Sequence, residues 1–318
     1  MPLSSSRTPV IIDCDPGQDD AVMLLMAFAS PELDIRGVTT VAGNVPLDLT
    51  QRNARIIADI AGRHDIAIYA GCDQPLVRPL VTAEYVHGKT GIDGIEIREP
   101  DTSLQAGHAV DFIIQTLLGA EDDSFTLVPT GPLTNIAMAI RKEPKILPRI
   151  RQIVLMGGAV REGGNTTSSA EFNIFVDPHA AHDVLHCGRP VTIAPLDVTH
   201  QVLVGPDVIE RIRRLGGPVA EATVGMLEFF NRFDTHKYGT EGAPLHDPCT
   251  IAWLLEPELF KGKFCNVEVE TGSELTMGHT AVDFWHVSQR PPNATWLYEI
   301  DPGGFFDLLV DRLARYEH

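Results

Sequence analysis

The sequence predicts an α/β fold, namely a doubly wound, mainly parallel (mixed) sheet with helices on both faces. Short apolar runs alternate with stretches of helical length along most of the chain, which is the rhythm of repeated βαβ units. Acidic and polar residues follow several of these runs directly. Ligands bind beyond the carboxyl ends of the strands in such sheets, so the same residues predict a binding crevice.

The first apolar run, Val10-Ile11-Ile12, is predicted to be a buried strand that carries the acids after it to the sheet edge. Ala21–Ala29 is apolar almost all round, as a buried helix is. Further strands are predicted at 35–41, 66–69, 125–128, 153–156, 191–194, 266–270 and 295–300. Further helices are predicted at 47–61, 108–118, 133–141, 178–186, 206–215, 219–233 and 304–316.

Two segments break this rhythm. Residues 71–106 have little periodicity, and residues 161–173 are polar and rich in glycine, threonine and serine. Long irregular loops inside a compact domain are commonly lids or binding loops, and each segment follows a predicted strand. We find no linker and no internal repeat, so residues 1–318 are expected to form a single domain.

The composition makes several kinds of partner and cellular location improbable for this protein. A formal net charge of -18 makes nucleic acids and anionic membranes poor partners. The chain has no run close to the roughly 18–20 apolar residues of a membrane span, and its first nine residues do not resemble a secretory signal. The five cysteines are scattered and odd in number. Together these features predict a protein of the reducing cytoplasm.

The strongest chemical signal is the run Asp13-Cys14-Asp15-Pro16-Gly17-Gln18-Asp19-Asp20. Its four carboxylates repel one another unless a cation or hydrogen-bond donors neutralise them. One acid could simply cap the helix that follows, but that explanation does not cover all four. Carboxylates are the oxygen ligands that hard divalent cations prefer, so we predict a divalent-metal site that activates water.

Two alternative explanations of this run can be weighed. An EF-hand does not fit, because its sixth position counted from Asp13 is Gln18 instead of glycine and its twelfth is Leu24 instead of glutamate. A phosphatase with an aspartyl nucleophile remains open, since Asp13-Cys14-Asp15 has the outline of its motif. Such an enzyme needs a lysine for the phosphate, and basic residues are sparse after the predicted strands.

Polar residues also follow other predicted strands. Asn44 comes after the second strand, and the main-chain carbonyl of Thr130 is free to face the crevice. The second irregular segment contributes Asn165, Glu171 and Asn173, and His246-Asp247-Pro248 precedes an apolar helix. In this last motif the alternative explanation of Asp247 is a helix cap before a proline at the first helical position.

The whole set of motifs resembles the nucleoside hydrolases, the inosine-uridine-type nucleoside N-ribohydrolases. The resemblance rests on DCDPGQDD, VAGN, VPTGPLTNIA, LMGG, AEFNIFVDP, LDVTH and HDP, which occur in the family's order along nearly the whole chain. It implies hydrolysis of the N-glycosidic bond of ribonucleosides to free base and ribose, in nucleoside salvage. It also implies a homo-oligomer, a tetramer or a dimer.

The resemblance assigns roles to individual residues. It implies that Ca²⁺ is bound by Asp15, Asp20, Asp247 and the carbonyl of Thr130, and that Asp15 is the general base for a metal-bound water. It places His246 as the catalytic histidine near the leaving base, with His87 as a second base-side histidine on a mobile loop. Substrate contacts are implied for Asp19, Asn44, Met156, Asn165, Glu171, Phe172 and Asn173.

The chemistry of the bond agrees with these assignments. An N-glycosidic bond breaks through an oxocarbenium-like ribosyl cation, which surrounding carboxylates stabilise. The leaving base needs a proton or a hydrogen bond, and histidine supplies either near neutral pH. Tyr238, about two helical turns before His246, resembles the pyrimidine-favouring members, so the enzyme is expected to lean towards pyrimidine nucleosides. A protein that binds nucleosides without turning them over is the alternative from another class.

Overall fold

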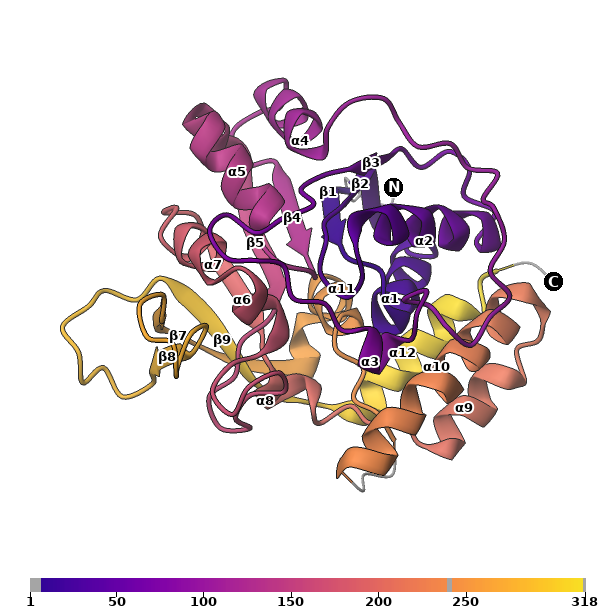
Figure 1. Cartoon of the computed structure of the whole chain (residues 1–318). Coiled ribbons are helices and arrows are strands. Elements are labelled where there is room, and N and C mark those ends of the chain that lie inside the picture. Colours follow the sequence, from indigo (N-terminus) through magenta and orange to yellow (C-terminus); the bar gives the residue numbers. More distant parts are fainter. Residues whose placement is uncertain (1–6, 239–241, 317–318) are drawn as a thin grey trace, which may run out of the picture.

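The computed structural model describes residues 7–238 and 242–316, with the side chains of 233–238 outside the described part. In the described ranges nine strands form one sheet in the order β3-β2-β1-β4-β5-β6-β9-β7-β8 (Figure 1). The strands are β1 (Thr8–Cys14), β2 (Leu33–Thr40), β3 (Ile68–Ala70), β4 (Phe125–Pro129), β5 (Ile150–Met156), β6 (Val191–Ala194), β7 (Phe260–Val269), β8 (Thr280–Asp283) and β9 (Ala294–Ile300).

The sheet is parallel from β3 to β9 and antiparallel where β7 pairs with β9 and β8. The helices are α1 (Gln18–Phe28), α2 (Leu47–Ile60), α3 (Glu84–His87), α4 (Ala109–Leu118), α5 (Thr134–Lys142), α6 (Phe172–Val176), α7 (Pro178–Leu185), α8 (Leu196–Thr199), α9 (Pro206–Arg213), α10 (Gly217–Tyr238), α11 (Pro248–Leu255) and α12 (Pro302–Leu313). The mixed, mainly parallel sheet of the sequence prediction is therefore confirmed.

Hydrophobic side chains are buried on both faces of the sheet. Strand β1 illustrates this, because successive side chains of a strand point to opposite faces. Val10 and Ile12 join a cluster that also contains residues of α1, α2 and α9 to α12. Ile11 joins a second cluster, formed with α4, α5 and α7. Figure 1 shows the two helix groups on opposite sides of the strands, which explains why the β1 sequence is apolar without alternation.

The structure differs from the sequence prediction mainly in short elements. β8, an edge strand, was not predicted because its four residues carry no extended apolar pattern. β7 begins at Phe260 instead of at residue 266. The first half of this strand is largely exposed and contains polar residues, so it lacks the apolar run by which the other strands were predicted. The irregular segment 71–106 contains only the single turn of α3, and the second irregular segment runs directly into α6.

The site follows from the connectivity of this sheet. From β1 the chain moves to β2 on one side, whereas β4 pairs with β1 on the other side. A crevice opens at such a switch point, beyond the carboxyl ends of the strands. The loop with Asp15 follows β1, the loop with Asn44 follows β2, and Thr130 follows β4 directly.

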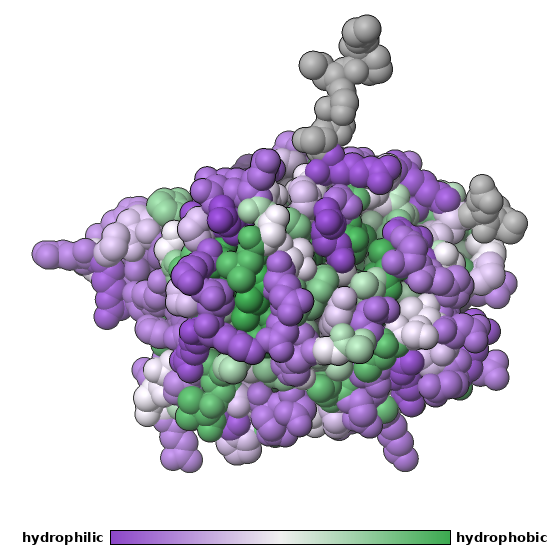
Figure 2. All heavy atoms as spheres, turned by 90° about the horizontal axis from the view of Figure 1, so that it is seen from above, coloured by the Kyte–Doolittle hydropathy of each residue, from purple (hydrophilic) through white to green (hydrophobic). Residues whose placement is uncertain are grey.

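The outer surface reflects the acidic composition. Figure 2 shows a face covered mostly by hydrophilic residues, with hydrophobic residues in small separate groups. Among the described helices, none combines the length and apolar character needed to cross a bilayer.

Candidate active site

The acidic run after β1 folds into the first turn of α1. Asp20 partly fulfils the capping role considered for these acids, since its Oδ2 accepts a hydrogen bond of 3.0 Å from the amide of Gly17. Its other oxygen accepts one of 2.9 Å from the Thr130 hydroxyl. Asp15 and Asp20 are fully buried, and Asp19 is nearly so. Capping therefore accounts for one oxygen of Asp20 and does not explain why the other acids of the run are buried.

Asp15 is held by the loop that follows β2. The amide of Asn44 donates a 2.7 Å hydrogen bond to Asp15 Oδ2, and the Asn44 side-chain amide donates to the Asp15 carbonyl at 3.1 Å. The backbone packs so closely here that a Cβ on Gly43 would lie 2.0 Å from Asp15 Oδ2, and one on Gly131 would lie 2.6 Å from Oδ1. The glycines of the VAGN and PTGP motifs thus make room for this carboxylate.

Asp247 comes from a distant part of the chain and lies beside the acids that follow β1. We call the buried carboxylates of Asp15, Asp19, Asp20 and Asp247 the acidic group. Asp247 occupies the N-cap position of α11, with Pro248 at the first helical position, but its side chain accepts no capping hydrogen bond. Instead, carboxylate oxygens of Asp19, Asp20 and Asp247 lie within 4.8 Å of one another, all buried. Asp247 thus occupies the N-cap position of the helix, but its side chain contributes to the acidic group instead of capping the helix.

Burial and mutual repulsion raise the pKa values of these carboxyl groups. The pKa of Asp19 is raised to about 8, by burial first and by the charge of Asp20 second. Burial and neighbouring carboxylates also hold the pKa values of Asp15 and Asp247 well above their usual range. Asp15 Oδ1 and Asp19 Oδ1 are buried and accept no hydrogen bond. Unpartnered carboxylate oxygens packed this closely fit a divalent cation, which would satisfy them and restore their charge.

Thr130 and Asn173 link the acidic group to the second irregular segment. The side-chain amide of Asn173 donates a 2.7 Å hydrogen bond to the Thr130 carbonyl and a 3.3 Å one to that of Met156. A carbonyl oxygen has two lone pairs, so Thr130 keeps one for another partner. This part of the site joins the carboxyl ends of β4 and β5.

Asp13 has a different environment from the other acids of its run. Its Oδ1 accepts hydrogen bonds from the Thr39 hydroxyl at 2.6 Å and from the Asn135 side-chain amide at 2.8 Å. Burial raises its pKa to about 7, despite these two bonds. Asn135 also donates to the Thr40 carbonyl and accepts from the Cys72 amide. Asp13 and Asn135 therefore tie β1, β2 and α5 together beneath the site.

Glu171 lies at the start of α6, where it accepts backbone hydrogen bonds. Its Oε2 accepts from the amides of Gly158 at 2.9 Å and Ile174 at 3.1 Å, and its Oε1 from the amide of Asn173 at 2.8 Å. Burial raises its pKa to about 7 even so. Asn165 accepts from the amide of Phe172, so the segment is fastened to the helix that it precedes.

A cavity brings most of the predicted site residues together. Its lining includes Asp19, Asn44, His87, Thr130, Met156, Asn165, Glu171, Phe172, Asn173, His246 and Asp247. Asp15 and Asp20 do not line it, but they contact the lining through Asn44 and through the acidic group. The side chain of Tyr238 lies outside the described residues. The lining also includes His200 and Phe230, to which the sequence assigned no role.

His246 lines this cavity and contacts Thr199 and His200. Its Nδ1 lies 2.7 Å from the Thr199 hydroxyl, and its ring centroid lies 5.7 Å from that of His200. Burial, followed by the nearby His200 and His87, holds the pKa of His246 well below its usual range. The ring is therefore neutral at neutral pH and can donate one N–H. Thr199 and His200 belong to the LDVTH motif, which contributed to the family resemblance but to whose residues the sequence analysis assigned no role.

His87 is fixed by Gln18, which the sequence analysis also passed over. The Gln18 amide nitrogen donates to the carbonyls of His87 at 2.9 Å and Asp93 at 3.1 Å, so its oxygen faces His87 Nδ1 at 2.7 Å. Nδ1 must then carry the hydrogen, which leaves Nε2 as an acceptor. The ring stacks on Phe230 at 5.5 Å, and burial lowers its pKa to about 4.

Comparison with known proteins identifies the family. The family model described as inosine-uridine preferring nucleoside hydrolase matches residues 10–307. The chain belongs to this family. As a nucleoside hydrolase it acts on N-glycosyl bonds, which rules out the aspartyl phosphatase considered for Asp13-Cys14-Asp15. The carboxylates of Asp19, Asp20 and Asp247 form a candidate metal site of the enzyme.

Relatives and solved structures match this nucleoside hydrolase over nearly its whole length. A pyrimidine-specific ribonucleoside hydrolase RihA of Photobacterium profundum is 50% identical over 97% of this chain and 99% of its own. An uncharacterised protein of Schizosaccharomyces pombe is 49% identical over 96% and 99%. Among solved structures, a plant nucleoside hydrolase matches with a TM-score of 0.91 at 30% identity, covering 96% and 99%. A purine-preferring ribonucleoside hydrolase from Gardnerella vaginalis matches at 0.90 and 31%, covering 96% and 98%.

Proposed function

We propose that this nucleoside hydrolase is calcium-dependent, cleaves ribonucleosides to free base and ribose, and prefers pyrimidine nucleosides. The observation that carries the proposal is the group of buried carboxylates beside the cavity, two of which have oxygens without any partner. The pyrimidine preference rests on the RihA relative at 50% identity.

The residues present fit a calcium ion. Asp15, Asp20, Asp247 and the carbonyl of Thr130 would hold it, and Asp19 adds an oxygen to the same group. All the donors are oxygens, which Ca²⁺ prefers, and the absence of imidazole among them disfavours zinc. When bound, the ion would lower the pKa of a coordinated water and so supply the nucleophile at neutral pH.

The carboxylates of the chain perform two further tasks. Asp15, whose Oδ2 is held by the Asn44 amide, is the general base for the attacking water. Positive charge develops on the ribosyl group as the glycosidic bond breaks. Asp19 and Glu171 line the cavity and stabilise that charge electrostatically.

The remaining lining residues orient the sugar. Asn44, Asn165 and Asn173 offer amide donors and acceptors for the ribose hydroxyls. Met156 and Phe172 pack against the apolar face of the ring and exclude water. Because Asn173 also binds the Thr130 carbonyl, the sugar-binding group and a proposed metal ligand are positioned together.

Two histidines face the base. His246, neutral in the free enzyme, donates a hydrogen bond to the departing base and so stabilises the negative charge that builds on it. His87 presents the acceptor Nε2 and suits a ring N–H or an amino group. A pyrimidine base offers a carbonyl acceptor together with such a donor, so both histidines find partners on it.

We further propose a role in nucleoside salvage, a cytoplasmic location and assembly into a homo-oligomer, a tetramer or a dimer. All five cysteines are free thiols, which supports a reducing compartment. The oligomeric state is measured directly by sedimentation.

A panel of nucleosides tests the function. Purified enzyme is incubated with uridine, cytidine, inosine, their deoxy counterparts and a phosphate monoester, and released reducing sugar and phosphate are measured. We expect sugar release, fastest from the pyrimidine ribonucleosides, and loss of all turnover in Asp15→Asn. Nucleoside binding without sugar release would show a binding protein, and faster cleavage of inosine than of uridine would reject the pyrimidine preference.

A further inference from the structure

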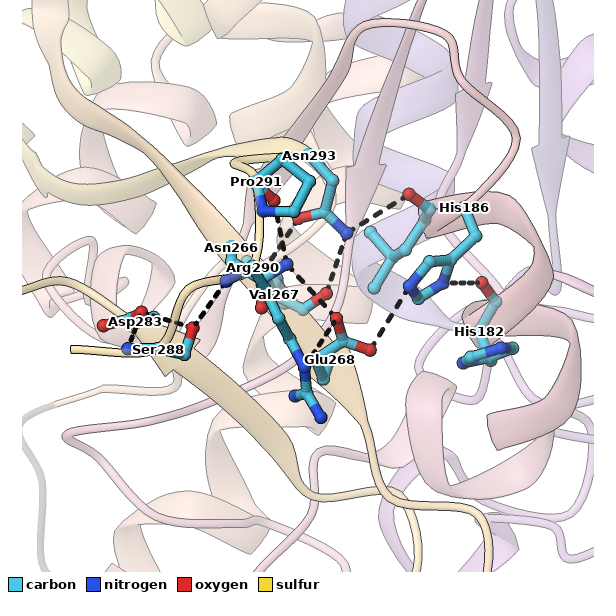
Figure 3. Close-up of polar contacts among 11 residues, drawn as sticks. His182, His186, Asn266, Val267, Glu268, Asp283, Ser288, Arg290, Pro291 and Asn293 are labelled. Carbon is cyan, nitrogen blue, oxygen red and sulfur yellow. Dashed lines mark hydrogen bonds and ion pairs between the residues drawn. The ribbon is translucent and has the colours of Figure 1, made fainter. Parts of the chain in front are cut away.

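A second group of residues that could hold a metal ion lies outside the lining of the cavity, between α7 and β7. His182 is on α7, His186 follows the last residue of that helix, and Glu268 is on β7 (Figure 3). One ligand atom from each lies within 4.8 Å of the others. None of the three lines the cavity of the active site. The two histidines are exposed, so an ion can reach the group from solvent.

His186 is oriented as a metal ligand. Its Nδ1 lies 2.8 Å from the carbonyl of His182, one turn earlier, and must donate a hydrogen to that acceptor. This fixes the ring and leaves the Nε2 lone pair free, as an outer hydrogen bond does for histidines that bind metals. Nε2 lies only 3.2 Å from Glu268 Oε2. Two lone pairs then face each other, unless a proton or a cation lies between them.

His182 is the third member of the group. Residues four apart on a helix lie on the same face, and here the two imidazole centroids are 4.2 Å apart. Uncharged imidazoles of this spacing commonly bind one ion together, as in helical zinc motifs. The sequence HDVLH contains this pair, but sequence alone did not indicate where a third ligand would come from.

Glu268 is held towards the histidines by its neighbours. Its Oε1 accepts a hydrogen bond of 3.2 Å from the Asn266 side-chain amide, and the Arg290 guanidinium lies 3.9 Å from the same oxygen. Oε2 therefore remains for the ligand group, as Figure 3 shows. With Arg290 offsetting the carboxylate charge, imidazole nitrogens contribute most of the affinity, which favours zinc over calcium.

The frame around the three residues is also fixed. Asn293 donates to the carbonyl of Leu185 at 3.3 Å and to that of Val267 at 2.9 Å, and accepts from the Val267 amide at 2.8 Å. Leu185 and Val267 directly precede His186 and Glu268 in the sequence. One asparagine thus bridges the two elements that carry the ligands (Figure 3). The distance between His186 and Glu268 is set by this bridge, so little reorganisation is needed for an ion to bind.

We propose that His182, His186 and Glu268 form a binding site for Zn²⁺ that is separate from the active site. Two imidazoles and one carboxylate supply three ligands, and water from the solvent fills the open position. The ion joins α7 to β7. Since it binds the folded protein and its ligands are apart in the unfolded chain, it stabilises the fold.

The test is a zinc titration by calorimetry in excess Ca²⁺, which keeps the acidic group of the active site from taking up zinc. We expect about one Zn²⁺ per chain, as a single three-ligand site implies. The double variant His182→Asn/His186→Asn and the single variant Glu268→Gln should lose affinity by more than the roughly 10–100-fold that removing an outer partner costs. His286→Asn is the matched control, because His286 is exposed and has a positive φ of 53°, which asparagine tolerates.

Thermal unfolding with and without zinc gives a second readout. The melting temperature should rise with zinc in the wild type and in His286→Asn, but not in the double variant. All variants should unfold like the wild type without zinc and keep its calcium-dependent activity, because the two histidines are exposed, Glu268 is half-buried and none of the three lines the cavity. Equal zinc affinity in the wild type and the double variant, or no binding in excess calcium, would overturn the proposal.

Discussion

The side-chain amide of Asn173 donates a 2.7 Å hydrogen bond to the main-chain carbonyl of Thr130. Asn173 belongs to α6, and Thr130 follows β4, so the bond joins a proposed sugar-binding residue to a proposed metal ligand across the carboxyl ends of the sheet. An amide donor polarises the carbonyl and fixes its direction. Sugar binding and metal binding are therefore expected to depend on the same contact.

Replacing Asn173 should weaken both kinds of binding. In Asn173→Ala the Thr130 carbonyl loses its partner, so we expect kcat/KM for uridine and the affinity for calcium each to fall roughly 10–100-fold, as for other outer-shell partners. Activity measured against calcium concentration separates the two effects. Asn165→Ala is the control, since Asn165 lines the cavity without contacting Thr130. A calcium affinity unchanged in Asn173→Ala would contradict the coupling.

Calcium should stabilise the protein more at high pH than at low pH. Without metal, burial raises the pKa of Asp19 to about 8, whereas in the unfolded chain it is near 3.8. The folded protein then binds more protons than the unfolded chain between these values, so metal-free stability falls as pH rises from 4 to 8. Calcium removes this loss by compensating the ionised carboxylates. The measurement is the melting temperature with calcium and with chelator at pH 5 and pH 8.

An equal calcium effect at both pH values would contradict this account of the acidic group. Asp19→Asn serves as the comparison, because it removes one raised carboxyl group. Its metal-free form should lose less stability between pH 5 and pH 8 than the metal-free wild type.

His87 should make the protein less stable in acid. Burial lowers its folded pKa to about 4, below the unfolded value of 6.5, so the unfolded chain binds more protons below pH 6.5. This contribution is fully present above pH 6.5 and is lost as pH falls towards 4. Between pH 7 and pH 5 the wild type should lose about 2 kcal/mol more unfolding free energy than His87→Gln. Chemical denaturation measures the difference, and parallel losses in both proteins would count against a buried neutral His87.

Gln18 should control the segment around α3. Its hydrogen bonds to His87 and Asp93 hold both ends of residues 87–93 over the cavity. Gln18→Ala removes them, so we expect KM to rise roughly tenfold or more with a smaller change in kcat. Hydrogen exchange of residues 84–93 should be faster in the variant, and a ribose-like inhibitor should slow it in the wild type. Identical exchange with and without inhibitor would argue against a lid.

His246 and Tyr238 should affect the bases differently. Help to the leaving base is typically worth roughly 10²–10⁴-fold, so His246→Ala should lower kcat on inosine within that range. Tyr238→Phe should lower kcat/KM for uridine or cytidine more than for inosine, if its hydroxyl binds a pyrimidine carbonyl. Kinetics of both variants on both substrates decide this. Equal losses on inosine and uridine in Tyr238→Phe would remove this residue from base selection.

Local sequence determined much of this protein. Apolar runs such as Val10-Ile11-Ile12 identified the parallel strands, because a strand covered on both faces must be apolar at every position. The acidic run and the polar residues after other strands predicted the site, since the carboxyl ends of parallel strands share one edge. These patterns involve residues that are close in sequence, so they can be recognised without knowledge of tertiary contacts.

The tertiary structure decided what depends on distant partners. It separated Asp13, bound by Thr39 and Asn135, from the other acids of its run, and it turned the Asp247 side chain from a helix cap to the acidic group. Gln18 acquires its role only because the chain brings it to His87, 69 residues later. Likewise, His182 and His186 meet Glu268 only when β7 packs against α7. Spacing along a chain does not encode such contacts, because packing of the sheet and its helices creates them.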